Sequence, residues 1–285
     1  MPSKFVQLRR QVTDRFFTGL AAGLSVVVIG ALVAILAYLV LRGAGSLNWA
    51  FFTQIQKPVG ESGGGMSNGI VGSIMILVIA SCLGVPLGIS AGVYLAEFGR
   101  GRLGKLVRFT ADVLNGVPSI VIGMVAWGLV VVQQKHFSAF AGGVALAIMM
   151  IPTVTRATEE MLLLVPQSVR EAAFGLGIPQ WRTTLSIILP SARAGILTGV
   201  MLAFARIAGE TAPLLFTAFG NQFWNLSPSQ PIAAMPLQIY TYALSPYDEW
   251  HRQAWAGALV LVLLIVGTTT LVRFVFLRRM MGGVR

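Results

Sequence analysis

The chain has 285 residues, of which 55% are hydrophobic and 11% are charged, and its mean hydropathy is +0.77. Soluble domains carry roughly 25% charged residues, so this composition excludes an ordinary soluble domain and indicates an integral membrane protein. The single cysteine, Cys82, lies in an apolar run, which excludes an intrachain disulfide and a metal site built from cysteines. The formal net charge of +11 fits nucleic-acid binding, an anionic membrane surface or membrane topology, and the positions of the charges separate these three.

Six apolar runs are predicted to cross a membrane as helices, since a span needs roughly 20 apolar residues. The first run, residues 18–42, follows a basic tail at residues 1–17. This run is longer than the apolar part of a signal peptide, which has roughly 7 to 15 residues, so we expect an uncleaved span. The fourth run is short, and we expect it to be tilted, broken at Pro152 or partly buried. The runs after the first cover residues 67–95, 113–132, 137–151, 192–219 and 254–272.

The basic residues are divided unevenly between the two sides of this predicted all-α bundle. Alternating the spans puts 16 of the 21 Lys and Arg residues on one side, with both termini and the tail at residues 276–285. Short cytoplasmic loops collect Lys and Arg, so this side is predicted to be cytoplasmic. Topology therefore explains the net charge, and we expect no nucleic-acid binding. The remaining basic residues are Arg42, Lys57, Lys135 and Arg252 on the outer side and Arg206 within a span.

The two long outer connections differ in composition. Residues 43–66 include three consecutive glycines at positions 63–65, which predict a flexible loop. Residues 220–253 contain four prolines and several Trp and Tyr residues. Such aromatic rings favour the membrane interface, but they also suit a docking surface for an external partner, so both interpretations stay open.

Two short motifs suggest enzyme chemistry but lie in the wrong context. Residues 99–106 nearly match a phosphate-binding loop, yet an apolar span precedes them and Leu106 stands where Ser or Thr would bind Mg²⁺. Residues 88–92 match the serine-hydrolase pattern G-x-S-x-G around Ser90, but both histidines fall on the opposite side of the membrane. Glycines recur every four residues at 84, 88 and 92, which favours a helix-packing face. No cluster has metal-ligand spacing, so we expect neither an enzyme nor a metal site.

The cytoplasmic connection at residues 152–191 is long and mixes polar with apolar residues, so it should have structure of its own. Ala172, Ala173 and Leu176 fall close together on one helical face, and Gly177 with a following proline ends or bends that helix. The pattern predicts a short surface helix, a turn and a second helix. Glu171 offers a charge to a basic partner, or pairs on the helix surface with Arg170 or another neighbour.

This segment resembles a motif of the membrane permeases of bacterial ABC importers: E-A-A, three residues, G, nine residues, and I-x-L-P. The resemblance implies an integral membrane, type I ABC importer permease fold, with a core at residues 67–275 and the first span outside it. It also implies that residues 167–190, here named the coupling loop, dock on a separate ATP-binding subunit. The matching positions are Glu171, Ala172, Ala173, Gly177, Ile187, Leu189 and Pro190.

The fifth predicted span contains Arg206 close to its centre, with Glu210 one helical turn further on. A charge at the bilayer centre costs about 2.5 to 3.5 kcal/mol on insertion scales, so it must face protein or water and marks a functional site. Arg followed by Glu is the less favourable order for a helix-stabilising pair. The guanidinium fork matches a tetrahedral oxyanion, and the carboxylate of Glu210 could orient the fork or weaken its hold.

Residues 205–216, 151–161 and 115–119 resemble the permeases of bacterial phosphate importers. This resemblance implies an anion path at Arg206, Glu210 and Arg156, a chain without a cofactor, and a place in the bacterial inner membrane. It implies four partners: a sister permease, two copies of a subunit that binds ATP and Mg²⁺, and an extracytoplasmic phosphate-binding protein. Two alternatives stay open. They are a permease for sulfate, molybdate or phosphonate, and a membrane phosphate sensor that transports nothing.

Overall fold

The computed structural model describes residues 4–58, 61 and 63–282, and within these residues every regular element is a helix. Two π-helical segments, Trp127–Val131 and Thr184–Ile188, join α5 to α6 and α9 to α10. A 3₁₀ turn, Ala44–Ser46, follows the first helix. The helices are α1 (Lys4–Gly43), α2 (Trp49–Thr53), α3 (Ser67–Glu97), α4 (Arg102–Gly116), α5 (Ser119–Ala126), α6 (Val132–Gln134), α7 (Ala139–Leu163), α8 (Gln167–Gly175), α9 (Gln180–Thr183), α10 (Leu189–Ala208), α11 (Ala212–Thr217), α12 (Met235–Ala243) and α13 (Asp248–Gly282).

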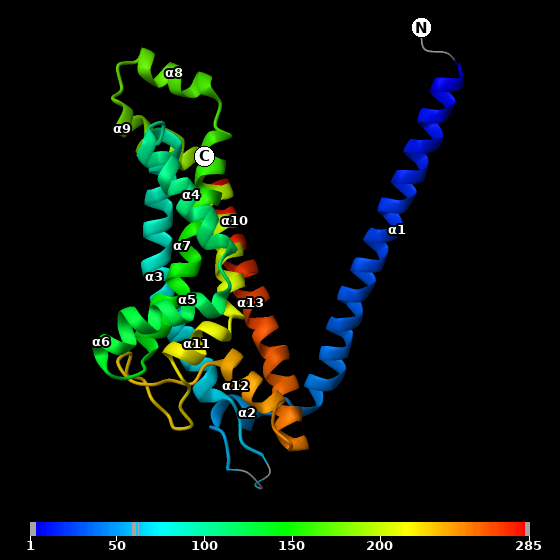
Figure 1. The fold of residues 1–285 in the computed structure, drawn as a ribbon, viewed down its shortest axis with the longest axis vertical. Coiled ribbons are helices and arrows are strands. Elements are labelled where there is room, and N and C mark those ends of the chain that lie inside the picture. Colours follow the sequence, from blue (N-terminus) through cyan, green and yellow to red (C-terminus); the bar gives the residue numbers. More distant parts are fainter. Residues whose placement is uncertain (1–3, 59–60, 62, 283–285) are drawn as a thin grey trace.

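Five helices are long and apolar enough to cross a membrane, and the number rises to six if a bent pair of helices is counted as one span. The pair consists of α4 and the segment from α5 to α6, which meet at 109° (Figure 1). The prediction of a single helix over residues 113–132 is therefore wrong. Pro118 lacks an N–H donor and disfavours a helical conformation at Val117, whose ψ of 133° is extended. The apolar run continues through this bend, so hydropathy alone cannot locate it.

Helix α7 lies at the centre of the bundle. Of the most apolar 18-residue stretch of this helix, 67% is buried, which confirms that the fourth span is partly buried. It is not broken at Pro152, because the helix continues to Leu163. The predicted glycine face of α3 is confirmed as well, since Gly84, Gly88 and a third glycine face α7. A Cβ on Gly88 would lie only 2.7 Å from the Cβ of Val154, so the two helices approach as closely as glycine allows.

The fifth span differs from its predicted range, residues 192–219. The continuous helix runs from Gln180 to Ala208, and the chain then breaks before the short helix α11. Gly209 follows the helix, and Pro213 stands in the first turn of α11, where its missing N–H costs nothing. Arg206 therefore lies in the last turn of α10 rather than at the centre of a helix.

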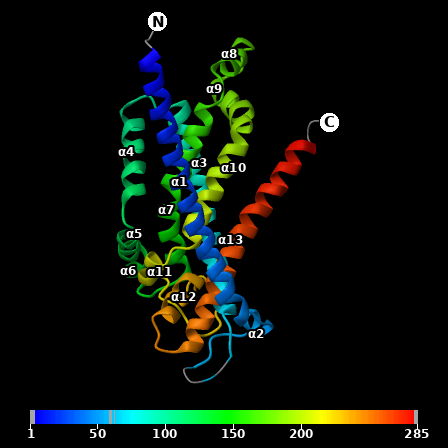
Figure 2. The ribbon, with the colours of Figure 1, turned by 90° about the vertical axis from the view of Figure 1, so that its right-hand side faces the viewer.

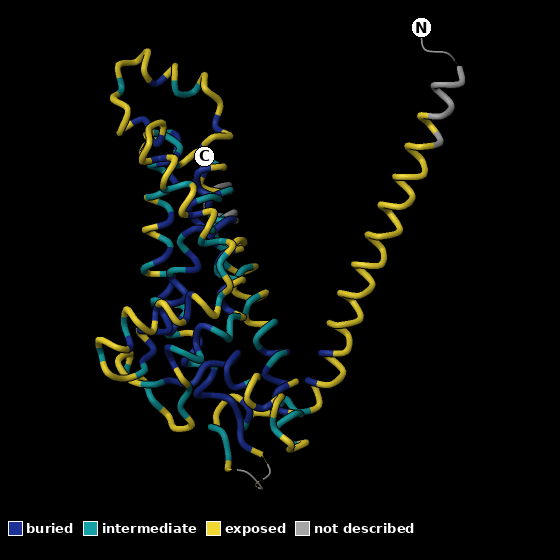
Figure 3. The backbone as a smooth tube through the Cα atoms, in the orientation of Figure 1, coloured by how far each residue is buried: buried dark blue, intermediate teal, exposed yellow. Residues whose placement is uncertain are grey.

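The coupling loop, the N-terminal end of α1 and the C-terminal end of α13 lie at the same end of the molecule (Figures 1 and 2). This arrangement agrees with the predicted topology, in which both termini are cytoplasmic. Helix α1 leans away from the bundle and is exposed along its apolar length (Figure 3). It contacts α13 only near its outer end, where the ring centroids of Tyr38 and Trp255 are 5.2 Å apart.

The outer end contains a second small apolar core. Tyr242 is buried in it, and its ring stacks on Trp250 with centroids 4.8 Å apart. These two aromatic side chains therefore pack within the fold. The glycines at 63–65 do not form the expected flexible loop, because Gly64 and Gly65 are buried beside α2. A Cβ on Gly65 would lie 2.4 Å from the carbonyl oxygen of Ala50, so close packing requires a glycine there.

Candidate functional site

The coupling loop is built from α8, a tight turn and α9. Gly177 has φ of +74°, a left-handed conformation in which glycine has no steric cost. Its N–H donates to the carbonyl of Phe174 at 2.9 Å, and the N–H of Ile178 donates to the carbonyl of Ala173 at 3.1 Å. These two bonds satisfy the carbonyls at the end of α8. The prediction that Gly177 and the next proline, Pro179, end this helix is confirmed.

The coupling loop exposes an apolar surface with a carboxylate beside it. Ala173 is buried, whereas Leu176 at the end of the helix is 80% exposed. Phe174 and Trp181 are also exposed, by 46% and 63%, next to the exposed Glu171. An apolar patch on a loop outside the membrane is typical of a binding surface for another protein. The other motif residues are exposed, at Ala172, Gly177 and Pro190, or half-buried, at Ile187 and Leu189.

Arg170 anchors α8 to the bundle. Its guanidinium donates to Glu97 at 2.9 Å and to the carbonyls of Leu162 and Val165 at 2.8 and 2.6 Å. The side chains of Arg170 and Glu97 are only 12% and 6% exposed. Because Arg170 pairs with Glu97, the alternative in which it pairs with Glu171 is wrong. Sequence reasoning missed this pair, although a lone carboxylate just after an apolar run was a usable signal.

A second set of ion pairs joins α4 to α7. The guanidinium of Arg156 donates to both carboxylate oxygens of Asp112, at 2.7 and 2.6 Å, and to Glu159 at 2.9 Å. Glu159, whose side chain is 4% exposed, also accepts from Arg108. Arg108 in turn donates to the carbonyl of Leu95 at 2.8 Å. Two arginines and two carboxylates neutralise one another here. In this conformation the guanidinium of Arg156 is therefore bound to carboxylates.

Arg206 and Glu210 are arranged differently. Arg206 is exposed in the last turn of α10, and Glu210 follows the end of the helix, where its N–H donates to the carbonyl of Ile207 at 3.2 Å. The expected spacing of one helical turn between the two side chains is therefore wrong. Within the described part of the chain, the ion pairs include Arg108, Arg156 and Arg170 but none of Arg206. Among these residues the guanidinium of Arg206 is therefore without a carboxylate partner.

A broken span beside a central buried helix, with a helical coupling loop on the cytoplasmic side, is the architecture of an ABC importer permease. Residues 84–280 match the family described as binding-protein-dependent transport system inner membrane component. Named relatives include the phosphate transport system permease protein PstA of Yersinia pestis, 46% identical over 87% of this chain and 84% of the relative. Another is PstA of Pasteurella multocida (strain Pm70), 47% identical over 85% and 86% of the two chains. The chain belongs to this permease family, in the group that includes PstA.

Solved structures of lower sequence identity share the fold of this chain. A subunit of the MetNI methionine ABC transporter in an inward-facing conformation matches with a TM-score of 0.60 and 17% identity, covering 77% of this chain and 98% of that one. An amino acid ABC transporter matches with a TM-score of 0.52 and 20% identity, over 74% and 92% of the two chains. At these identities the likeness establishes the fold alone. The chain is a multi-pass transport permease rather than an enzyme, and its family has no cofactor of its own.

Proposed function

We propose that this chain is a permease subunit of an ATP-driven phosphate importer in the bacterial inner membrane. The 46% identity to a phosphate transport system permease over 87% of the chain carries this proposal. The free guanidinium of Arg206 supports it, because a planar fork donates two parallel bonds to a tetrahedral oxyanion. In this proposal Arg206 and Glu210 line the anion path. Arg156 joins the path only in a conformation in which Asp112 releases it.

The partners follow from the two ends of the molecule. A sister permease completes the path on the exposed side of Arg206, and an extracytoplasmic phosphate-binding protein delivers the anion at the end of α11 and α12. Two ATP-binding subunits hold ATP and Mg²⁺ on the cytoplasmic side, and one of them receives the coupling loop. The exposed apolar surface around Phe174 and Trp181 supports a protein cleft as the binding site for this loop.

Coupling uses the continuity of one helix. The segment Gln180–Ala208 is helical from the coupling loop to Arg206, so its ends are about 40 Å apart at 1.5 Å per residue. A displacement of the loop by the ATP-binding subunits therefore moves Arg206 with it. The nearby carboxylate of Glu210 repels an anion, which assists release once the path opens to the cytoplasm. Opening and closing of the path around this site is a rigid-body transition of packed helices.

The test compares Arg206→Ala, Arg206→Lys and the control Arg193→Ala in the assembled complex, with phosphate uptake and ATP hydrolysis measured together. Arg193 is an exposed arginine on the same helix at its cytoplasmic end. We expect Arg206→Ala to abolish uptake while ATP hydrolysis continues, Arg206→Lys to retain part of it, and the control to be unaffected. Normal uptake in both Arg206 variants would contradict the site.

The same assay separates the alternatives. Competition by sulfate, molybdate or phosphonate at low concentration would identify another oxyanion as substrate. A sensor that transports nothing would leave cellular phosphate uptake intact when Glu171 or Gly177 is replaced. The proposed permease instead requires uptake to fall in those variants, because the coupling loop would no longer follow the ATP-binding subunit.

A further inference from the structure

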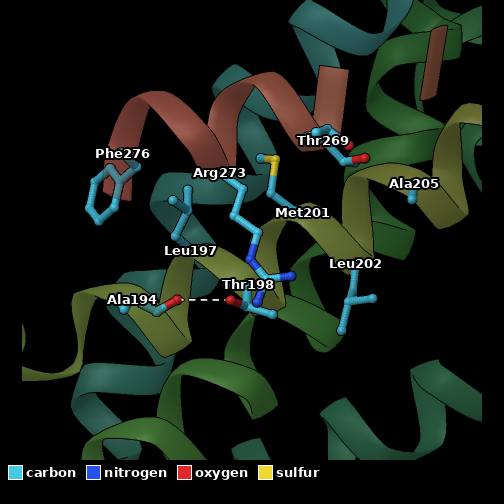
Figure 4. A pocket seen from close by; sticks show the side chains of 10 residues that line it. Ala194, Leu197, Thr198, Met201, Leu202, Ala205, Thr269, Arg273 and Phe276 are labelled. Carbon is cyan, nitrogen blue, oxygen red and sulfur yellow. Dashed lines mark hydrogen bonds between the residues drawn. The ribbon is translucent and has the colours of Figure 1, made fainter. Parts of the chain in front are cut away.

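A groove of about 320 Å³ lies between α10 and α13 on the cytoplasmic side of Arg206. Figure 4 shows the side chain of Arg273 reaching across from α13 toward Thr198 on α10, with Met201 and Leu202 beside it. Ala194 on α10 and Thr269 on α13 also line the groove.

Arg273 is the charged residue of this lining, which contains no Asp or Glu. Within the part of the chain that the structure describes, the ion pairs do not include Arg273, just as they do not include Arg206. An arginine without a carboxylate, in a groove whose other side chains are uncharged, gives the groove a positive potential. The groove is therefore suited to an anion, which the guanidinium N–H groups of Arg273 can bind.

The threonines add a second chemical requirement. The hydroxyl of Thr198 donates to the carbonyl of Ala194 at 2.9 Å, and that of Thr269 donates to the carbonyl of Ile265 at 2.8 Å. Their hydrogens are thus used within the helices, and their oxygens remain as acceptors. A ligand of Arg273 that also contacts these oxygens needs an anionic oxygen and a hydroxyl group on the same ion. Phosphate at neutral pH carries both, whereas sulfate and the phosphodiester of a membrane lipid carry no such hydroxyl.

The groove reaches Arg206 through Leu202, which lines the groove and stands one helical turn before Arg206 on α10. Ala194, Thr198, Leu202 and Arg206 follow one another at intervals of four residues, and all four are exposed. Each interval turns about 40° around the helix, so the series winds slowly toward Arg206. Thr198 precedes Arg206 by eight residues, which places it about 12 Å closer to the cytoplasm along the helix. An anion that leaves Arg206 toward the cytoplasm past Leu202 therefore meets Arg273 next.

We propose that Arg273, Thr198 and Thr269 form a second phosphate site, on the exit side of the path. This inference rests on the proposed function, because it names the next binding position for the same ion. Arg273 donates to the anionic oxygens, and the two threonine oxygens accept from the P–OH group. The second site divides the passage from Arg206 to the cytoplasm into two shorter steps, and the first of them runs between two cations.

The test measures whether phosphate protects a thiol placed in the groove. The assembled transporter carries Cys82→Ser and Ala194→Cys, so that this chain has one thiol, and is placed in nanodiscs of phosphatidylcholine. Labelling of this chain by a water-soluble maleimide is timed with inorganic phosphate, with sulfate at equal ionic strength, or with neither. At a phosphate concentration about twice the Kd, roughly a third of the sites are empty, and labelling should slow about threefold.

Matched variants assign the protection to named residues. We expect Arg273→Gln and Thr198→Val each to remove the protection by phosphate, and Arg193→Gln to retain it, because Arg193 lies outside the groove. Sulfate should not protect. Arg206→Ala should leave the protection by phosphate intact. The uptake assay therefore tests the role of Arg206, and the labelling assay tests the second site independently.

Three results would overturn the proposal. Equal protection by sulfate would mean that the groove responds to charge alone. Slow labelling in nanodiscs that contain phosphatidylglycerol, without added phosphate, would assign the groove to a lipid headgroup. Absence of protection at any phosphate concentration, with uptake normal in Arg273→Gln, would leave Arg273 as a residue that only sets membrane orientation.

Discussion

The ion pair between Arg170 and Glu97 should contribute strongly to stability because both side chains are buried. Their exposures of 12% and 6% place the pair among buried ion pairs, for which removal of one partner costs about 3 to 5 kcal/mol. Glu97→Gln keeps the shape of the side chain and removes its charge. Arg170 retains its bonds to the carbonyls of Leu162 and Val165, so we expect a loss near the lower end, about 3 kcal/mol.

The measurement is the free energy of unfolding in mixed detergent, followed by tryptophan fluorescence, together with phosphate uptake per ATP hydrolysed in the complex. Glu249→Gln is the matched control, because Glu249 and Arg252 are 37% and 65% exposed and such pairs contribute about 0.2 to 1 kcal/mol. The double variant Glu97→Gln with Arg170→Gln should lose less than the two single losses combined, since no charge is left unpaired. Equal losses in Glu97→Gln and Glu249→Gln would refute the reasoning from burial.

Three further predictions concern single positions. Gly177→Ala should destabilise the conformation of the coupling loop by about 1 to 2 kcal/mol and lower phosphate uptake, because alanine disfavours φ of +74°. Gly177→Asn should destabilise it less, since asparagine tolerates this φ. Phosphate uptake per ATP hydrolysed measures both variants. Gly88→Leu should destabilise the fold by about 1 to 3 kcal/mol or more, because a Cβ at this position would already lie 2.7 Å from Val154. Gly267→Leu is the control and should leave stability unchanged, because nothing lies within 4 Å of a Cβ there. Thermal unfolding measures both variants. Burial raises the pKa of Tyr242 from 10.0 to about 12. The unfolded chain releases this proton first, so stability should fall between pH 10 and about 12, and Tyr242→Phe should remove that part of the loss in a pH series.

The sequence predicts the straight spans well because their apolar runs and their helices coincide. Helix α3 begins at Ser67 as expected, and the glycines that face α7 were found from their spacing alone. The prediction fails where an apolar run continues through a break in the helix. Val117 and Pro118 bend the third span, and Gly209 ends the fifth, yet neither position interrupts the hydropathy of its run.

The ion pairs of the site were not predictable for a different reason. Arg108 and Asp112 are four residues apart on α4, and Arg156 and Glu159 are three apart on α7, so each couple lies on one helix face. This spacing does not say which two faces meet. Only the packing of α4 against α7 shows that Arg156 is held by Asp112, and hence that its role differs from that of Arg206.

The distinction between paired and free arginines connects the architecture to transport. Positive charges gather on the cytoplasmic side of a membrane protein for reasons of topology, so their number alone indicates no function. Arg108, Arg156 and Arg170 fix α4 and α8 against α3 and α7 through carboxylates and carbonyls. Arg206 and Arg273 have no carboxylate in the described ion pairs, and both border the exposed face of α10. Because α10 is continuous with α9 in the coupling loop, the helix that carries the free guanidinium of Arg206 is also the one that the ATP-binding subunit would move.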